Sequence, residues 1–293
     1  MEFYVRTLVE SLKPLVSAQM VICARSYVDI KGVSVVELGV ESLGKSPSLS
    51  YQLQSFSDVV SPRLKDFKKQ GYLIHSHERV EGHDVSTQHG PLIGSSILSN
   101  FSSKYSLWKN LEYNELNCKA IVPVSKLLAD DIADKYPIIS NRMVGIGWPG
   151  MPCSQKLSLS RPSPPRKDRG SKEIKALFVG RETKRKGLDF AVKVVNRVRS
   201  LGWNMTLSIV GPEKVLKNLP DFVNFLGWRE RVPYEEFDLL IHPARQEPFG
   251  MCVTEAYCAG IPSFVSENVG AKDLGLEGVF ELRLIDKPQA WAE

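Results

Sequence analysis

The chain has 293 residues, of which 43% are hydrophobic and 24% are charged, and its formal net charge is +5. These values are typical of a globular protein with one large or two medium domains, and they exclude a disordered or fibrous chain. No apolar run reaches about 18 residues, so no transmembrane helix is predicted. The five cysteines are odd in number and scattered, which argues against a disulfide framework and for a reducing cytosol.

The first half of the chain predicts alternating helices and strands. Residues 2–15 carry apolar side chains at helical spacing and predict an amphipathic helix. Strands are predicted at 19–24, 33–38, 72–75, 84–87, 120–124 and 142–146. Further helices are predicted at 43–60, ending before Pro62, at 102–116, and at 126–136 with Ser125 as the N-cap. Because a helix precedes the first strand, the sequence suggests that an opening strand is absent.

Four of the five histidines fall between residues 75 and 91, at His75, His77, His83 and His89. Their spacing fits no common zinc pattern and no cysteine lies near them, so no metal site is predicted. One interpretation is a set of hydrogen-bonded loop residues. The other is that His89, in a Gly-Pro turn after a strand, points into a cleft and hydrogen-bonds a substrate hydroxyl.

Residues 154–173 are rich in serine, proline and basic residues and predict a flexible linker near a domain boundary. A phosphate or membrane contact is the alternative. Together with a basic segment at 63–69, this stretch also fits peripheral contact with anionic lipid. Nucleic acid binding is not predicted, because the basic residues are not interleaved with exposed aromatic residues as stacking platforms require.

The second half of the chain has a more regular pattern. Strands are predicted at 175–179, 206–210, 223–226, 238–241 and 263–266, and helices at 188–200 and 252–259. Strands that alternate with helices favour a parallel, doubly wound α/β sheet.

Two carboxylates eight positions apart, Glu247 and Glu255, follow the predicted strand at 238–241. Pro248 and Gly250 force a turn between them before the predicted helix begins. In α/β proteins, ligands bind at the carboxyl ends of strands and the amino ends of helices. Both carboxylates can therefore face one polyhydroxylated ligand.

A basic turn at 180–187 follows the first strand of the second half and contains Arg181, Lys184, Arg185 and Lys186. A guanidinium matches phosphate oxygens as a planar fork, and a lysine adds a compact charge beside the helix start. The glycine spacing fits neither a P-loop nor a dinucleotide fingerprint. A solvated loop is one interpretation; combined with the carboxylates at the same sheet edge, the cations predict a nucleotide-sugar site.

These motifs together resemble retaining glycosyltransferase family 4, the glycosyl transferases group 1. The matching stretches are Gly180-Arg181 with Lys186-Gly187, Ile209-Val-Gly211, Phe225-Leu-Gly227, Glu247-Pro-Phe-Gly-Met and Glu255-Ala256. The resemblance is dense from 173 to 273 and weaker in the first half, where Thr87-Gln-His-Gly90 matches in kind.

The resemblance implies two Rossmann-like, doubly wound α/β domains facing a cleft, the GT-B fold. Residues 1–150 would form the acceptor-side domain, 151–173 the linker and 174–293 the nucleotide-sugar-binding domain. Family members begin with a strand and a glycine-rich turn and end with helices that return to the first domain. The chain thus resembles a form shortened at both ends, with an N-terminal domain that lacks its first strand.

Four residues would have catalytic roles by this resemblance. Arg181 and Lys186 would neutralise the donor diphosphate as it leaves. Glu247 would hold hydroxyls of the donor sugar, and His89 would touch the sugar from the opposite domain.

The remaining donor contacts are implied in the same way. Gly180 lies beside the cations, Trp228 lies where the family contacts the nucleobase, and Glu255 would bind the ribose hydroxyls. Backbone N–H groups for sugar and phosphate oxygens would come from Phe249, Gly250 and Met251.

The implied activity is that of a retaining hexosyltransferase. It would move a sugar from a UDP-, GDP- or ADP-linked donor to a glycan or glycolipid acceptor, in surface polysaccharide or lipopolysaccharide synthesis. No Asp-x-Asp triplet is present, so neither a metal nor a cofactor beyond the donor is predicted. The expected location is the cytoplasm, with peripheral contact at the inner face of the plasma membrane. The alternative is a catalytically weak nucleotide-sugar-binding or interaction protein of the same fold.

Overall fold

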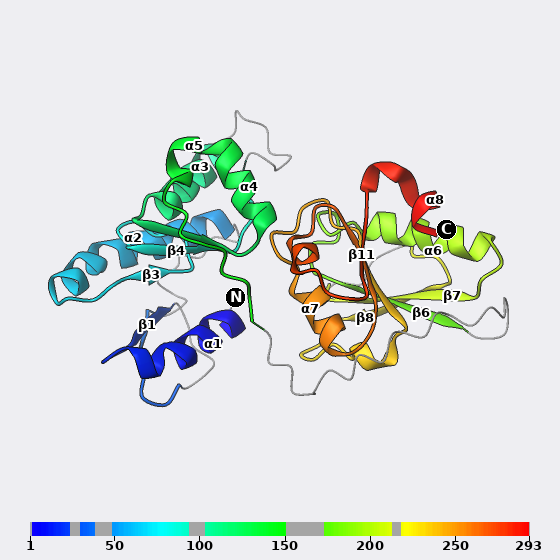
Figure 1. Cartoon of the computed structure of the whole chain (residues 1–293), viewed down its shortest axis with the longest axis horizontal. Coiled ribbons are helices and arrows are strands. Elements are labelled where there is room, and N and C mark those ends of the chain that lie inside the picture. The colour runs from blue at the N-terminus through cyan, green and yellow to red at the C-terminus, as the bar shows by residue number, and fades with distance from the viewer. Residues whose placement is uncertain are drawn as a thin grey trace. The chain divides into compact units, whose positions relative to one another are not determined.

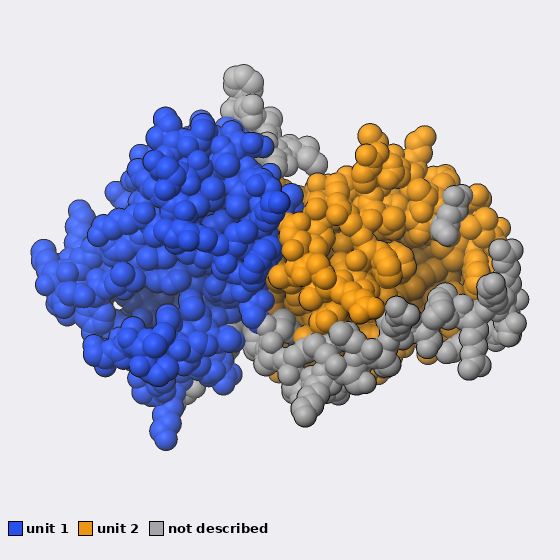
Figure 2. All heavy atoms as spheres, in the orientation of Figure 1, with its two compact units in different colours: residues 1–150 blue, residues 151–293 orange. Residues whose placement is uncertain are grey.

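The computed structural model of the chain describes residues 2–23, 30–38, 49–93, 103–150, 173–212 and 218–292. The chain divides into two compact units, residues 1–150 (unit 1) and residues 151–293 (unit 2), which are coloured separately in Figure 2. All of the predicted linker except residue 173 lies outside the described residues. Among the described helices, none combines the length and the apolar character that a bilayer crossing needs.

Unit 1 contains two parallel sheets and their connecting helices (Figure 1). Strand β1 pairs with β2, and the second sheet has the order β3-β4-β5. The elements are α1 (Glu2–Leu12), η1 (Lys13–Leu15), β1 (Met20–Cys23), β2 (Ser34–Glu37), α2 (Leu49–Lys69), β3 (His75–Ser76), β4 (Val85–Gln88), α3 (Ser103–Leu116), β5 (Ala120–Pro123), α4 (Lys126–Lys135) and α5 (Pro137–Ser140).

Helix α2 continues through Pro62, so the prediction that this helix ends before the proline is wrong. A proline inside a helix removes one backbone hydrogen bond and costs about 3 kcal/mol. The neighbouring Val60 and Leu64 are buried against Val80, and this packing holds the helix together across the interruption. The basic segment at 63–69 is consequently the last part of a helix.

Three other predictions need correction. The strand predicted at 142–146 is reduced to one isolated bridge between Ile121 and Met143. The strand predicted at 72–75 is the two-residue β3, because only His75 and Ser76 pair with β4. Cys258 is disulfide-bonded, whereas Cys23, Cys118 and Cys252 are free, so the argument against disulfides does not hold for Cys258.

Ser125 caps helix α4 as predicted, because its Oγ accepts a hydrogen bond from the backbone N–H of Leu128 at 3.0 Å. We expect Ser125→Ala to lower the free energy of unfolding by about 1 kcal/mol, and Ser125→Gly by only a few tenths. Urea unfolding of the whole chain, followed by circular dichroism, measures both changes. Equal losses in the two variants would show that the cap contributes little.

Unit 2 is built on a six-stranded parallel sheet in the order β11-β10-β9-β6-β7-β8, which confirms the predicted parallel, doubly wound arrangement. In Figure 1, α6 and α8 lie on one side of this sheet and α7 on the other. The elements are β6 (Ile174–Val179), α6 (Leu188–Ser200), β7 (Met205–Val210), β8 (Val223–Gly227), η4 (Tyr234–Glu236), β9 (Leu239–His242), α7 (Met251–Cys258), β10 (Ser263–Ser266), η5 (Gly270–Leu274), β11 (Val279–Leu282), η6 (Leu284–Asp286) and α8 (Lys287–Ala292).

The strand order reverses between β6 and β9, which are neighbours in the sheet. From β6 the chain adds β7 and β8 in one direction, and from β9 it adds β10 and β11 in the other. This is the Rossmann order, and in such sheets ligands bind outside the carboxyl ends of the strands at the point of reversal.

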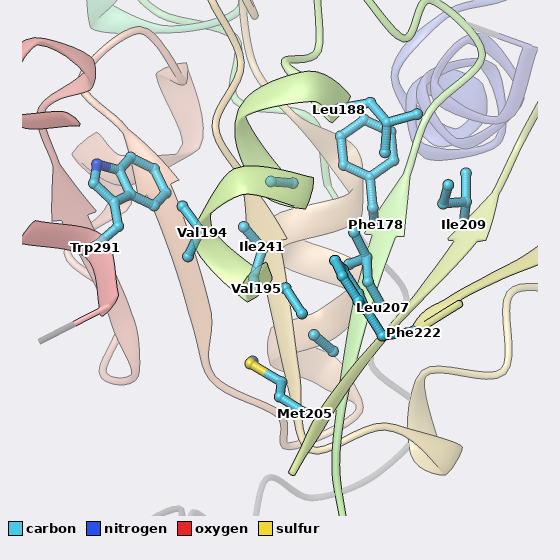
Figure 3. Packing of buried hydrophobic residues seen from close by; sticks show 12 residues of the cluster. Phe178, Leu188, Val194, Val195, Met205, Leu207, Ile209, Phe222, Ile241 and Trp291 are labelled. Carbon is cyan, nitrogen blue, oxygen red and sulfur yellow. The ribbon is translucent and has the colours of Figure 1, made fainter. Parts of the chain in front are cut away.

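The core of unit 2 lies between α6 and the sheet, where Val194 and Val195 pack with strand residues that include Leu207 and Ile241 (Figure 3). Trp291 of α8 closes this core: its ring lies 5.2 Å from that of Phe190, and its Nε1 donates to a backbone carbonyl. The packing fixes β6 and α6, which carry the ends of the basic turn.

Candidate functional site

Two loops meet where the strand order reverses: the β6–α6 loop (180–187) and the β9–α7 loop (243–250). Gly187 adopts a φ of 76°, and a Cβ there would lie 2.0 Å from the carbonyl oxygen of Pro243. Gly180 has a φ of 156°, and a Cβ there would lie 2.3 Å from Lys186 Cδ. Glycine at 187 therefore allows the two loops to approach each other closely, and glycine at 180 leaves room for the Lys186 side chain within its own loop.

Arg245 links the two loops from the outside. Its guanidinium makes two parallel contacts with Asp189, at 2.9 Å (Nη1–Oδ1) and 2.7 Å (Nη2–Oδ2). Its Nη1 also donates to the carbonyl of Lys184, and its backbone N–H donates to the carbonyl of Arg185. A bidentate pair of this kind adds geometric specificity, and here it fixes the position of the β9–α7 loop relative to the β6–α6 loop and the start of α6.

Three cationic or cation-capable groups surround the carboxylate of Glu247. Lys186 Nζ lies 2.7 Å, Arg185 Nη1 3.4 Å and His242 Nε2 3.6 Å from the same oxygen, Oε2. Glu247 is only 9% exposed, and His242 is fully buried. The predicted residues Lys186 and Glu247 therefore lie together in the structure.

Burial alone would raise the pKa of Glu247, but contacts with His242, Lys186 and Arg185 outweigh it and hold this pKa far below its ordinary value. Burial would likewise lower the pKa of Lys186, and the neighbouring Glu247 raises it instead. Because the pKa of Glu247 is lowered in the folded protein, its ionised form stabilises the fold above the ordinary value of 4.5, and this stabilisation is lost as the pH falls toward the folded pKa. Because the pKa of Lys186 is raised, its ionised form stabilises the fold below the ordinary value of 10.5, and this stabilisation is lost as the pH rises further. The pair is consequently ionised across the neutral range.

Glu255 lies on the second turn of α7 and accepts a hydrogen bond from the hydroxyl of Tyr234, which comes from η4 and is buried. Burial and the nearby Cys252 and Glu255 raise the pKa of Tyr234, so its hydroxyl keeps its proton at neutral pH. The tyrosine therefore orients one oxygen of Glu255.

The other residues predicted to contact the donor lie at different places in unit 2. Phe249 is buried, and Gly250 adopts a φ of 101° as the N-cap of α7, which begins at Met251. The first N–H groups of a helix have no partner within the helix, so this turn offers donors to a ligand. Arg181 is exposed in the β6–α6 loop, and Trp228, 52% exposed, follows the edge strand β8. The arginine that contacts Glu247 is Arg185.

His89 belongs to unit 1 and lies in a cluster of aromatic rings. Its Nε2 is 3.0 Å from His77 Nδ1, and its ring packs edge-on against Tyr4. Burial lowers the pKa of His89 to about 4 and that of His77 to about 3, so both rings are neutral at pH 7. The described residues include no group of three or more potential ligands that could hold a metal. A contact of His89 with a donor sugar stays a prediction.

A diphosphate-compatible set of cations and an ionised carboxylate thus occur together where the strand order of unit 2 reverses, the position at which Rossmann sheets have their ligand crevice. Residues 173–293 match the family model of the glycosyl transferases group 1. The match lies within unit 2 and covers less than half of the chain.

Two curated relatives extend this result. An uncharacterized glycosyltransferase of Methanocaldococcus jannaschii is 26% identical over 180 residues, covering 53% of this chain and 44% of that protein. An uncharacterized 41.2 kDa protein in the cps region of Klebsiella pneumoniae is 33% identical over 109 residues, covering 34% of this chain and 29% of that protein. The matched regions span less than half the length of either relative.

Similar solved structures cover nearly the whole chain. WaaG, a glycosyltransferase involved in lipopolysaccharide biosynthesis, has a TM-score of 0.73 at 19% identity and covers 93% of this chain and 79% of its own. Sucrose-phosphate synthase from Thermosynechococcus elongatus has a TM-score of 0.69 at 18% identity, and the match covers 99% of this chain and 81% of that protein. Anabaena HepE in complex with UDP and glucose has a TM-score of 0.61 at 16% identity, and the match covers 99% of this chain and 84% of that protein. These likenesses confirm the predicted α/β GT-B fold; the absence of an opening strand stays a prediction.

The sequence analysis missed the partners of the two glutamates. Tyr234 precedes Glu255 by 21 positions, and no local pattern links them. His242 had a usable signal, because it is a polar residue that ends a buried strand at the crevice. A histidine in that position is costly unless it has a charged or polar partner.

Proposed function

We propose that unit 2 binds a nucleotide-diphosphate sugar at the β6–α6 and β9–α7 loops, and that the protein is a retaining, metal-independent glycosyltransferase. The observation that carries this proposal is the Lys186–Glu247 pair at the reversal of the strand order, in which the carboxylate is buried and the lysine is largely buried. In one place it supplies a cation for a departing diphosphate and a carboxylate for sugar hydroxyls. The match to glycosyl transferases group 1 supports the same reading.

The chemistry that we propose is the one that the family resemblance implies. An acceptor oxygen forms a bond to the anomeric carbon from the face that the diphosphate leaves, and its proton passes to the departing phosphate oxygen. Negative charge develops on the diphosphate, where Lys186 and the arginines of the same loop stabilise it. Preorganised charge of this kind is usually the largest contribution to catalysis. These side chains supply positive charge that other transferases take from a metal.

We propose a glycan or glycolipid acceptor of the cell surface. WaaG is involved in lipopolysaccharide biosynthesis, and the relative from Klebsiella pneumoniae is encoded in a cps region; both support this acceptor class. HepE was solved with UDP and glucose, so UDP-linked donors are the first to test, before GDP- and ADP-linked ones. We place the reaction in the cytoplasm at the inner face of the plasma membrane, where a net charge of +5 favours anionic lipid.

Calorimetric titration with UDP, GDP and ADP tests the binding step. We expect one of them to bind, and Arg181→Ala to weaken that binding about tenfold, the cost of losing one charge-assisted phosphate contact. Arg63→Ala removes the same charge from an exposed position on α2 and serves as the control. Equal nucleotide affinities of Arg181→Ala and the wild type would show that Arg181 does not contact the nucleotide.

Donor-dependent transfer or hydrolysis tests the enzymatic step. We expect turnover of the sugar donor whose nucleotide binds, and its loss in Glu247→Ala. Binding of a nucleotide without turnover of any donor would instead favour a nucleotide-sugar-binding protein of the same fold.

A further inference from the structure

His242 is the last residue of β9, and its imidazole is fully buried between two groups of the β9–α7 segment. Its Nε2 lies 3.6 Å from Glu247 Oε2, and its Nδ1 lies 3.6 Å from Cys252 Sγ on the first turn of α7. Phe178 of β6 packs near the ring, with 6.5 Å between centroids. The histidine thus joins the end of a core strand to the carboxylate of the crevice.

Three side chains contact the carboxylate of Glu247 through only one of its two oxygens. Lys186, Arg185 and His242 all contact Oε2. Lys186 and Arg185 come from the β6–α6 loop, whereas His242 comes from the core of the sheet. A carboxylate with one oxygen held from two directions has a fixed plane, so the position of its other oxygen, Oε1, is fixed as well.

We infer that His242 is a positioning residue: it holds Glu247 from the buried side so that the carboxylate presents Oε1 to the hydroxyls of the donor sugar. This inference rests on the proposed function. His242 itself lies in the core and acts on the donor only through Glu247.

The charges around His242 favour its protonated form. Burial would lower its pKa, but Cys252 and Glu247 raise it to about 9 against the opposing charge of Lys186. At 3.6 Å the contact with Glu247 is an ion pair and not a hydrogen bond, so it depends on the imidazolium charge. Because the folded pKa lies above the ordinary 6.5, the hold on Glu247 is complete below pH 6.5 and is lost as the pH rises through about 9.

Two substitutions of His242 distinguish a role in positioning Glu247 from a role in core packing alone. The amide nitrogen of His242→Gln reaches the place of Nε2, whereas that of His242→Asn reaches only the place of Nδ1. We expect His242→Asn to lower the preference for a sugar nucleotide over the bare nucleotide about tenfold, with the affinity for the bare nucleotide unchanged. His242→Gln reaches the carboxylate but carries no charge, so it should restore only part of that preference and should lack the alkaline decline of the wild type.

The binding measurement uses three probe pairs: UDP with UDP-glucose, GDP with GDP-mannose, and ADP with ADP-glucose. Calorimetry at pH 7 and pH 9.5 gives both affinities for the pair that binds the wild type. Parallel losses for the nucleotide and its sugar form in His242→Asn would indicate a structural role and overturn the inference. A wild type that binds nucleotide without preferring any of the sugar forms would also overturn it, while nucleotide binding itself would still stand.

A second measurement needs no ligand. Nuclear magnetic resonance of the histidine rings in the full chain should show His242 protonated at pH 8. Glu247→Gln should lower its midpoint, whereas Glu255→Gln, a matched change on α7, should leave it in place. A neutral His242 at pH 7 overturns the inference even if nucleotides bind. If no nucleotide binds the wild type, the proposed function fails and this inference fails with it.

Discussion

Lys186→Ala is expected to lower donor-dependent sugar transfer by about 10²–10³-fold, the usual effect of removing one preorganised charge from a developing anion. Lys186 has the shortest contact with Glu247, at 2.7 Å, and its side chain is 17% exposed. In this setting water replaces the lost charge poorly. The substitution also leaves Glu247 with only Arg185 and His242, so its pKa rises and its hold on a sugar weakens.

Lys184→Ala is the matched control, because Lys184 lies in the same loop with an exposed side chain and the same charge. Its transfer rate should stay within about twofold of the wild type, since exposed charges contribute little. Rates measured with a saturating donor, together with the affinity for the bare nucleotide, compare the two variants. Similar rates for Lys184→Ala and Lys186→Ala would show that only the net charge of the loop matters.

Gly187→Ala is expected to lower the free energy of unfolding by more than about 3 kcal/mol, which is large for a single added methyl group. The new Cβ would lie 2.0 Å from the carbonyl oxygen of Pro243, a backbone atom that cannot move without shifting the β9–α7 loop. The φ of 76° adds strain for any residue with a side chain.

Gly202→Ala separates these two effects. Gly202 has a φ of 93°, but a Cβ there meets nothing within 4 Å. This variant should lose only the conformational cost, about 1–2 kcal/mol. Chemical denaturation of both variants gives the difference, which measures the contact between the loops. If Gly187→Ala lost no more stability than Gly202→Ala, the loops would not be in close contact.

The elements of unit 2 were the most predictable from sequence. Helix α6 begins at Leu188 and ends at Ser200 as predicted, because its apolar residues recur at helical spacing and Gly202 follows. Strand β10 also has the predicted bounds, since Pro262 precedes its first residue. In both cases the local pattern and the tertiary packing favour the same structure.

Unit 1 departs from prediction where local signals and packing conflict. Pro62 is a strong local stop signal, yet Val60 and Leu64 pack into the core on either side of it. The segment at 142–146 has strand-like composition but forms only one bridge, through Met143. Its extent depends on pairing partners that a sequence pattern does not contain.

For the site, the sequence predicted the residue types better than their partners. Lys186 and Glu247 were both predicted to bind the donor, but not to contact each other. Arg185 contacts Glu247 as well, although Arg181 matches the family pattern better. Such contacts depend on loop geometry over about 60 positions, and residue identity alone does not determine them.

The neighbouring position of β6 and β9 also affects how the chain is made. Ala176 pairs with Leu239, so α6, β7 and β8 leave the ribosome before the partner that covers this side of β6. During that interval β6 has an open edge in the middle of the future sheet. Open strand edges pair readily with other chains, and pairings over long sequence separations form slowly. The strand order at the ligand-binding edge therefore also gives the nascent chain a period in which an inner strand has an unpaired edge and can aggregate.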